Sequence, residues 1–303
     1  MTDYIWIDTE NAIGRTRKDI RITRLIALDT EYDSFRYFRE RLCLLQIRTE
    51  ARTYLFDPLA NIDLSFLADC FADPDTTKII HAGDNDIRLL KRDYGFEFKN
   101  IFDTQKAASM LGHHNLSLSS IIRQALGIEL QKSKKLQRSR WDIRPLTEQQ
   151  KAYAVQDIQY LIDLYKKFRV ELAEKGLNRK ATQVFEQAAS VVWTERVLDQ
   201  SGYLRIIGSR DLRRDQKTRL KNLFQWRFQK AKETDTAVFM ILSDQNLIDL
   251  ARCKIRTLEA MKKIARIPSG KITRFGPEII DALKRTGKKA EIQVPADSLS
   301  GSG

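Results

Sequence analysis

The chain has 303 residues, a length that predicts about two domains. Its composition, 42% hydrophobic and 31% charged, is typical of a folded globular protein and excludes a fibrous or disordered chain. No stretch is apolar enough to span a membrane, and the N-terminal segment lacks a basic region followed by an apolar core. We therefore expect neither a membrane span nor a secretory signal, and we expect a cytoplasmic protein.

The first half of the chain alternates between strand-like and helix-like segments. Short apolar or alternating runs predict strands, and apolar positions at helical spacing predict helices. The expected strands are residues 24–32, 42–48, 53–57 and 78–82. The expected helices are residues 64–72, 84–95, 104–112, 116–127 and 147 to about 174. This pattern predicts an α/β domain.

The second half reads as helical throughout. Residues 177–200 predict one helix, 201–210 a linker, and every apolar run from Leu212 onward has helical spacing. The sequence therefore predicts a small all-helical second domain. The low-complexity end, PADSLSGSG, predicts a disordered tail.

The positive charge is concentrated in the last third of the chain. The formal net charge is +13. Residues 1–204 hold 31 lysines and arginines against 29 acids, whereas residues 205–290 hold 22 against 9. A basic module after a near-neutral one indicates a polyanionic partner, with nucleic acid ahead of a membrane surface, although a solvated basic face is the alternative.

Cysteine and histidine are too scarce to carry the chemistry of an enzyme. The three cysteines, Cys43, Cys70 and Cys253, have no disulfide or zinc spacing. With only three histidines, a histidine-rich metal site or a Ser-His-Asp triad is improbable. If the chain is an enzyme, its chemistry must run on carboxylates.

Two acids lie at the end of the first apolar strand. Asp29 and Glu31 are two residues apart, so on a strand their side chains share one face, roughly 7 Å apart. Solvated acids at a strand end are the common explanation of such a pair. The wholly apolar LIAL before them indicates a central strand instead, where charges need a partner or a metal.

Two further acidic groups lie downstream. In HAGDNDIRLL a strand meets a helix, and Asp84 suits the role of a helix cap, which leaves Asp86 for chemistry. In YAVQD, Tyr153 and Asp157 are four residues apart on one helix face and can act on the same ligand. Ordinary amphipathic packing is the alternative for that pair.

These residues, in this order, resemble the DEDD exonuclease superfamily, in the subgroup with a tyrosine in the third motif. The intervening text, from LDTEY and HAGxxDI to RSRWDIRPLTEQQKAYAVQD, is similar to ribonuclease D over about residues 21–170. The segments LxxLFQWRxxxA and FGPEIIDAL, within about residues 211–286, resemble the helicase and ribonuclease D C-terminal (HRDC) domain. One departure is Arg140, which precedes the tryptophan of the loop where the family often has an acid.

The resemblance implies a ribonuclease H-like exonuclease domain, a mixed sheet flanked by helices, at residues 1–176. It further implies a helical linker at 177–210, an HRDC domain at 211–290 and a tail at 291–303. The implied activity is 3′–5′ exoribonucleolysis that trims structured RNA such as tRNA precursors and releases nucleoside 5′-monophosphates. A monomer is favoured.

The resemblance also implies residue roles. Two Mg²⁺ or Mn²⁺ ions supply the chemistry. Asp29 bridges both ions, Glu31 and Asp157 hold the ion that activates water, Asp86 supports the second, and Tyr153 orients the water. We expect Thr30 and a basic loop to contact the RNA. The basic residues of that loop are Lys132, Lys134, Lys135, Arg138, Arg140 and Arg144.

Two alternatives remain open. Relatives on this nuclease fold include DNA exonucleases, and no residue is identified that reads a 2′-hydroxyl. A nucleic-acid-binding protein with an inactive nuclease fold is the second alternative, against which the complete set of acids argues.

Overall fold

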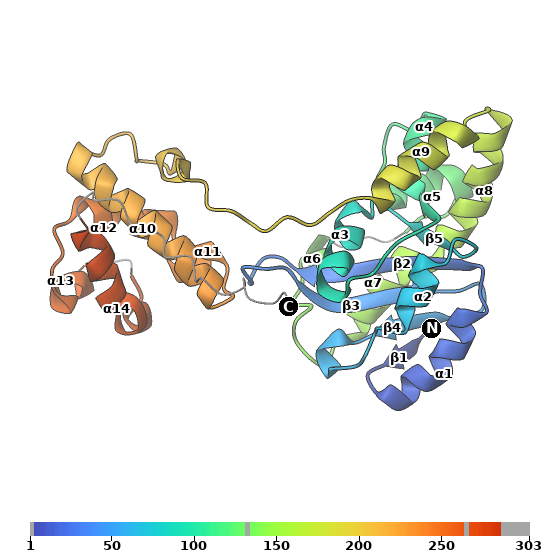
Figure 1. The fold of residues 1–303 in the computed structure, drawn as a ribbon, viewed down its shortest axis with the longest axis horizontal. Coiled ribbons are helices and arrows are strands. Elements are labelled where there is room, and N and C mark those ends of the chain that lie inside the picture. The colour runs from blue at the N-terminus through green and yellow to red at the C-terminus, as the bar shows by residue number, and fades with distance from the viewer. Residues whose placement is uncertain (1–2, 131–133, 264–266, 286–303) are drawn as a thin grey trace, which may run out of the picture. The chain divides into compact units, whose positions relative to one another are not determined.

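The computed structural model describes residues 3–130, 134–263 and 267–285. The chain divides into two compact units (Figure 1). The first comprises Met1–Phe35 and Glu40–Glu195, and the second comprises Arg36–Arg39 and Arg196–Gly303. Among the described residues, no helix is both long and apolar enough to cross a bilayer.

The first unit is built on one mixed six-stranded sheet in the order β1-β4-β3-β2-β5-β6. Strand β2 pairs with β3 in antiparallel register and with β5 in parallel register, so it lies inside the sheet. The strands are β1 (Ile5–Ile7), β2 (Leu25–Asp33), β3 (Arg41–Arg48), β4 (Thr53–Phe56), β5 (Thr77–Ile80) and β6 (Ile101–Asp103). The predicted mixed sheet flanked by helices is confirmed.

Helices cover both faces of this sheet (Figure 1). Helices α1 (Glu10–Arg21), α2 (Leu67–Ala72) and α3 (Asp84–Tyr94) contribute to a core on one face, whose strand residues include Leu28 and Leu45. On the other face, a second core contains Ala27 and Ile79, and a third contains Leu44 and Leu55. The helices contributing to these two cores are α4 (Thr104–Leu111), α5 (Leu118–Leu126), α7 (Glu148–Gln159), α8 (Leu161–Glu174) and α9 (Asn178–Ala189). Burial on both faces explains why the strands are nearly continuous apolar runs.

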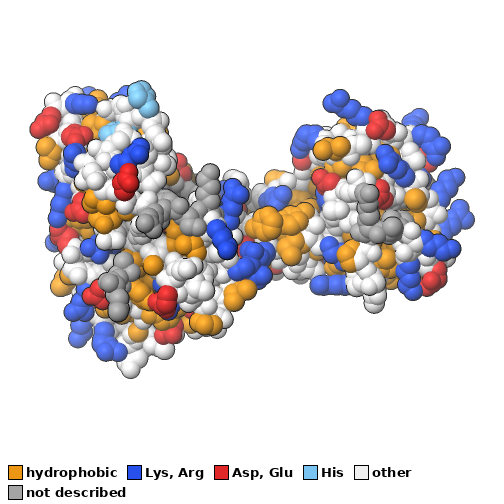
Figure 2. Space-filling view, turned by 180° about the vertical axis from the view of Figure 1, so that it is seen from behind, with side chains coloured by type: hydrophobic (Ala, Val, Ile, Leu, Met, Phe, Trp, Pro, Cys, Tyr) orange, Lys and Arg blue, Asp and Glu red, His pale blue; other side chains and the backbone are white. Residues whose placement is uncertain are grey.

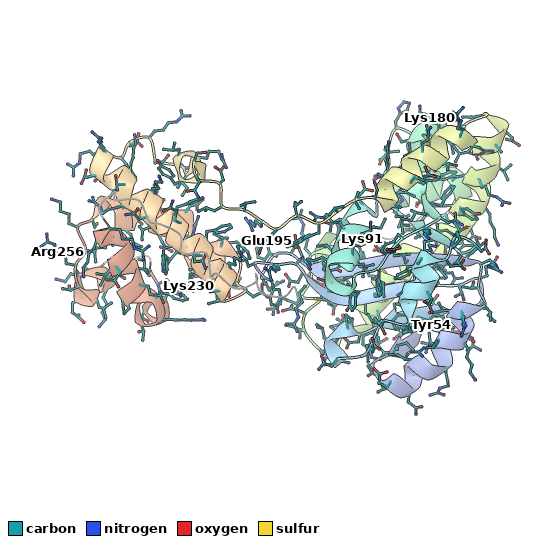
Figure 3. All side chains as sticks on the ribbon, viewed as in Figure 1. Tyr54, Lys91, Lys180, Glu195, Lys230 and Arg256 are labelled. Atoms are coloured by element: carbon teal, nitrogen blue, oxygen red, sulfur yellow. The ribbon has the colours of Figure 1, made fainter. Side chains whose placement is uncertain are left out.

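Two predicted helices are wrong in extent. The helix expected from 147 to 174 is two helices, α7 and α8, separated at Tyr160. The two pack on different partners, α7 on β3 and β4 and α8 on α4, and spacing alone does not reveal such a change of partner. The helix expected over 177–200 ends at Ala189, where the Lys91 side chain of α3 donates to the carbonyls of Ala189 and Val191 (Figure 3).

Two elements near the N-terminus were not predicted. Strand β1 pairs with β4 at the edge of the sheet, and α1 begins at the N-cap Thr9. Strand β1 has only three residues, too few for a periodic pattern. Helix α1 has 12 residues, but its buried positions are Ile13, Thr16 and Ile20, so only two apolar side chains mark its buried face in the sequence.

The second unit is all-helical, as predicted. Its helices are η2 (Gly202–Arg205), α10 (Arg214–Glu233), α11 (Val238–Ile241), α12 (Asp244–Arg252), α13 (Leu258–Lys262) and α14 (Ser269–Lys284). Its core also includes Phe38, whose ring meets Phe228 edge-on at 5.2 Å between centroids. The backbone N–H of Ala237 donates to the carbonyl of Arg36 at 2.8 Å. The segment between β2 and β3 is thus part of this unit, which the sequence did not indicate. The expected tail at 291–303 lies outside the described residues.

Candidate active site

Asp29 and Glu31 lie on β2 and face the same side of the sheet. In the register with β3, Asp29 is opposite Gln46 and Glu31 is opposite Leu44. Leu44 packs with residues of α7, so this is the face that α7 covers. A register irregularity, typical of a β-bulge, lies between Glu31 and Tyr32.

Helix α7 brings Tyr153 and Asp157 to this face, and both side chains are buried. The helix begins with a capping box in which Thr147 and Gln150 bond each other's backbone N–H. The amide of Gln150 also donates to the Ser139 hydroxyl and the Arg140 carbonyl, which ties the preceding loop to the helix.

The electrostatics of Tyr153 show which acids influence its hydroxyl. Burial raises the pKa of Tyr153 well above its usual value, and the negative charges of Asp157, Glu31 and Asp29 raise it further. A hydrogen bond with Asp157 acts in the same direction. Three of the four predicted acids therefore converge on the predicted tyrosine, which stays protonated at neutral pH.

Asp86, the fourth predicted acid, lies in the first turn of α3 and is held by a residue of β2. Its carboxyl accepts a hydrogen bond from the hydroxyl of Thr30, the residue between Asp29 and Glu31. Burial raises the pKa of Asp86 to about 6, and the charge of Asp103 adds to this rise. Thr30, which was expected to contact substrate, thus links β2 to α3.

Asp84 does not cap the helix as expected. The N-cap of α3 is Gly83, which has no side chain to cap with, and Asp84 is the first helical residue. One oxygen of Asp84 pairs with the ammonium of Lys106 at 2.8 Å, and its side chain is half exposed.

The sequence analysis missed Asp103, which builds the turn that leads into α3. Its buried carboxylate accepts hydrogen bonds of 2.8–3.1 Å from four backbone N–H groups, those of Ala82, Gly83, Gln105 and Lys106. Ala82 has a left-handed φ of 56°, and a Cβ on Gly83 would collide with Ile80. The signal available in the sequence was the segment FDTQ at residues 102–105, in which an acid precedes a helix.

Arg144, which the sequence analysis expected to contact RNA, is engaged within the protein. Its guanidinium pairs with the Asp57 carboxylate through two bonds of 2.6 Å. Its remaining donors go to the carbonyls of Trp141, Ile143 and Cys43. All five N–H donors of the guanidinium are used, so none remains for a phosphate.

The rest of the basic loop is more accessible. Lys135, Arg138 and Arg140 are exposed, and Arg140 makes a two-bond pair with Asp142 at 2.7 Å. Lys134 begins the short helix α6 (Lys134–Gln137), and its side chain lies outside the described part. Lys132 lies outside the described residues altogether.

The acids suit a hard divalent cation in their chemistry. Within the described residues, no group of three or more His, Cys, Asp and Glu side chains forms a ready metal site. The negative charges of Asp29, Glu31 and Asp157 nevertheless all act on the Tyr153 hydroxyl, and these side chains offer only the oxygen donors that Mg²⁺ and Mn²⁺ prefer. The donor set therefore fits such an ion.

Comparison with known proteins decides the family. A family model described as a 3′-5′ exonuclease matches residues 4–173, and an HRDC domain model matches residues 216–283. Ribonuclease D of Escherichia coli is 30% identical to the chain, over 98% of the chain and 77% of its own length. This chain belongs to the ribonuclease D family of 3′–5′ exoribonucleases.

Solved structures agree with this family. The structure of Escherichia coli ribonuclease D, an exoribonuclease involved in structured RNA processing, matches with a TM-score of 0.71 and 27% identity, over 99% of this chain and 79% of that one. Brucella melitensis NrnC, solved with bound Mg²⁺, shares the fold with a TM-score of 0.54 at 23% identity, over 63% of this chain and 91% of that one. DEDD exonucleases depend on divalent metals.

Eukaryotic relatives are longer proteins. The exosome complex component 10 homolog of Drosophila melanogaster is 29% identical over 86% of this chain, but the match spans only 29% of that protein. The match to Escherichia coli ribonuclease D covers more of this chain than the match to the Drosophila protein does. The predicted combination of an exonuclease domain and an HRDC domain is confirmed.

Proposed function

We propose that this chain shortens RNA from a free 3′ end by metal-dependent hydrolysis, with tRNA precursors and other structured RNAs as substrates. The observation that carries the proposal is that Asp29 and Glu31 lie on the face of β2 that is covered by α7, the helix of Tyr153 and Asp157, and that all three acids act on the pKa of Tyr153. The related Escherichia coli enzyme, described as processing structured RNA, supports the substrate class. The Mg²⁺ bound to Brucella NrnC supports the metal.

Four acidic side chains would together bind two cations. Asp29 would bridge both, Glu31 and Asp157 would hold one, and Asp86 the other. When bound, such ions supply an activated water and offset the charge that builds up on the phosphate. The protonated Tyr153 hydroxyl donates to Asp157, and its oxygen would accept a hydrogen bond from the attacking water and so orient it. Helix α7 and strand β2 keep these side chains in place because both are buried elements of one core.

RNA binding is the task we assign to the exposed basic residues. Figure 2 shows many Lys and Arg side chains and few acidic ones on the visible face of the helical unit. Some are neutralised internally: Lys230 on α10 pairs with Glu233 and Glu278. Others, such as Lys254 and Arg256 after α12, are exposed and have no ion pair among the described residues. Arg256 is labelled in Figure 3. These are the candidates for phosphate contacts.

The test compares matched substrates with Mg²⁺ and with Mn²⁺. We expect the chain to release nucleoside 5′-monophosphates from a 3′-tailed RNA and to leave a circular RNA of the same sequence intact. Faster degradation of the matched DNA would favour the DNA exonuclease alternative. Binding without any release would favour an inactive nucleic-acid-binding protein. Cuts in the circle that persist with an inactive Asp29 variant would indicate a contaminant, whereas cuts that disappear with it would contradict exonuclease action.

Tyr153→Phe is expected to retain cation binding and to lower kcat by about 10²-fold or more, because it removes only the hydroxyl that orients water. Single-turnover hydrolysis of a 3′-labelled RNA measures this. The loss should be smaller than that of Asp157→Asn. A Tyr153→Phe protein as fast as wild type would assign the tyrosine to packing alone.

Asp86→Asn and Asp84→Asn form a matched pair two residues apart. We expect the first to lose turnover, because it removes a proposed cation ligand, and the second to retain it within about threefold, because Asp84 contributes a partly exposed ion pair. Initial rates at saturating Mn²⁺ check both variants. The reverse result would mean that Asp84 is the ligand.

Replacing Lys254 and Arg256 together by Ala is expected to flatten the salt dependence of RNA binding. Each lost phosphate contact lowers the slope of log K against log salt by roughly 0.7 for a single strand. Fluorescence anisotropy at several salt concentrations gives the slope. The control is Lys230→Ala, whose charge is already paired, and which should keep the wild-type slope. Equal slopes for all three proteins would mean that these charges are merely solvated.

We also propose a cytoplasmic monomer. The three cysteines, Cys43, Cys70 and Cys253, are free thiols in accord with a reducing compartment. Light scattering of the purified chain and cell fractionation test the two statements.

A further inference from the structure

Gln46 is a polar side chain in a fully buried position. It lies on β3 with 0% of its surface exposed. Neither its Nε2 nor its Oε1 has a hydrogen-bond partner among the residues that the structure describes. A buried amide that makes none of its hydrogen bonds is unfavourable, and such a group calls for a specific explanation.

The surroundings of Gln46 offer one polar neighbour. In the sheet it lies directly opposite Asp29 on β2 and opposite Leu55 on β4. Side chains directly opposite each other share a face, with Cβ atoms about 4.5–5.5 Å apart. On that face Leu44 and Leu55 pack with Ala154 of α7. Gln46 is therefore an amide between an apolar wall and a proposed cation ligand.

A residue of similar size without polar atoms, such as leucine or methionine, would pack against this wall without leaving two polar atoms unbonded. The amide therefore has to be accounted for by a polar neighbour at the site, and Asp29 lies directly opposite. A carboxylate binds a cation well when its oxygens are held in the right orientation, and hydrogen bonds from neighbouring residues hold them there. Gln46, the residue directly opposite Asp29, carries an amide N–H donor.

We propose that Gln46 is a positioning residue: its side-chain amide donates a hydrogen bond to the Asp29 carboxylate and holds it in the orientation that binds the divalent cation. The inference rests on the proposed metal-dependent activity. Gln46 itself touches neither substrate nor water in this role. Its effect is on cation affinity and on the chemical step, with little effect on RNA binding.

The test uses the full-length chain with Gln46→Met, which keeps the size and removes the amide, and Gln46→Glu, which keeps the shape and removes the N–H donor. The matched control is Leu45→Met, on the same strand but on the opposite face, in the core that α1 to α3 line. Mn²⁺ affinity is measured from the electron paramagnetic resonance signal of free Mn²⁺. Thermal unfolding without cation and kcat and KM on a 3′-tailed RNA are measured on the same proteins.

We expect Gln46→Met without cation to unfold at the wild-type temperature or higher, because an unbonded amide has been removed. It should bind Mn²⁺ about 10- to 100-fold more weakly and lose kcat with KM for RNA nearly unchanged. Gln46→Glu should likewise lose Mn²⁺ affinity and kcat. If the Met variant does not fold, the Glu variant tests the inference. Leu45→Met should match wild type in Mn²⁺ affinity.

A stable Gln46→Met protein with wild-type Mn²⁺ affinity and kcat would overturn the inference, because the amide would then be packing only. Equal losses in Leu45→Met would overturn it too, since any disturbance of β3 would then suffice. If the wild-type chain itself neither binds Mn²⁺ nor shortens RNA, the proposed function fails, and the inference with it. The wild-type result thus separates the two failures.

Discussion

Asp29→Asn is expected to reduce turnover at least about 10³-fold while the fold and RNA affinity persist. The substitution removes one negative charge and one anionic oxygen from the residue proposed to bridge both cations. Asp29 lies on a strand whose apolar neighbours, such as Leu28, remain in the core, so the loss should be chemical rather than structural. Nucleotide release from a 3′-labelled RNA at saturating Mg²⁺ and Mn²⁺ measures it.

The control is Asp69→Asn on α2, which removes the same charge from an exposed position. It should retain the wild-type rate. Circular dichroism and RNA anisotropy establish that the Asp29 variant is folded and binds. Near-normal turnover in a folded Asp29→Asn protein would contradict the two-cation proposal at its centre.

Arg144→Ala is expected to lower the free energy of unfolding by about 3–5 kcal/mol, the usual effect of removing one partner of a buried ion pair. The Asp57 carboxylate, whose side chain is 6% exposed, would lose its two-bond partner. Three backbone carbonyls would lose a donor at the same time. Urea unfolding followed by tryptophan fluorescence gives the change.

The matched control is Arg138→Ala, six residues earlier in the same loop and exposed. It should change stability by no more than about 0.5 kcal/mol. It should instead weaken RNA binding, since Arg138 has donors available for phosphate. The opposite pattern, a stable Arg144→Ala protein with weakened RNA binding, would restore the original prediction that Arg144 contacts substrate.

Much of the fold followed from local patterns. The apolar runs of β2, β3 and β4 and the terminating Gly95 of α3 are short-range signals that survive in the folded chain. The order of acids around them indicated the exonuclease family, which the comparisons confirm. The boundary between α7 and α8 did not follow, because a change of packing partner at Tyr160 leaves no mark on helical spacing.

For the proposed site, the identities of Asp29, Glu31, Tyr153 and Asp157 were available from spacing and family resemblance. The structure adds their convergence, which the electrostatics of Tyr153 report. The roles of these residues remain predictions to be tested. An isolated Gln such as Gln46 has no periodicity that distinguishes it from a surface residue. The position of Asp103 before a helix indicates a cap, but it does not reveal the hydrogen bonds to Ala82 and Gly83.

Arg144 and Arg138 show most directly what the sequence alone could not predict. In the sequence both are arginines of one basic loop, and nothing separates them. In the fold, Arg144 pairs with Asp57, which is 87 residues away along the chain, and all its N–H donors bond to other protein groups. Arg138 stays exposed. Residue type and spacing are local properties. They were enough to predict most helices and strands, the exonuclease family and the concentration of positive charge in the last third of the chain. Which polar groups pair with each other depends on contacts between distant segments, and those form only when the chain folds.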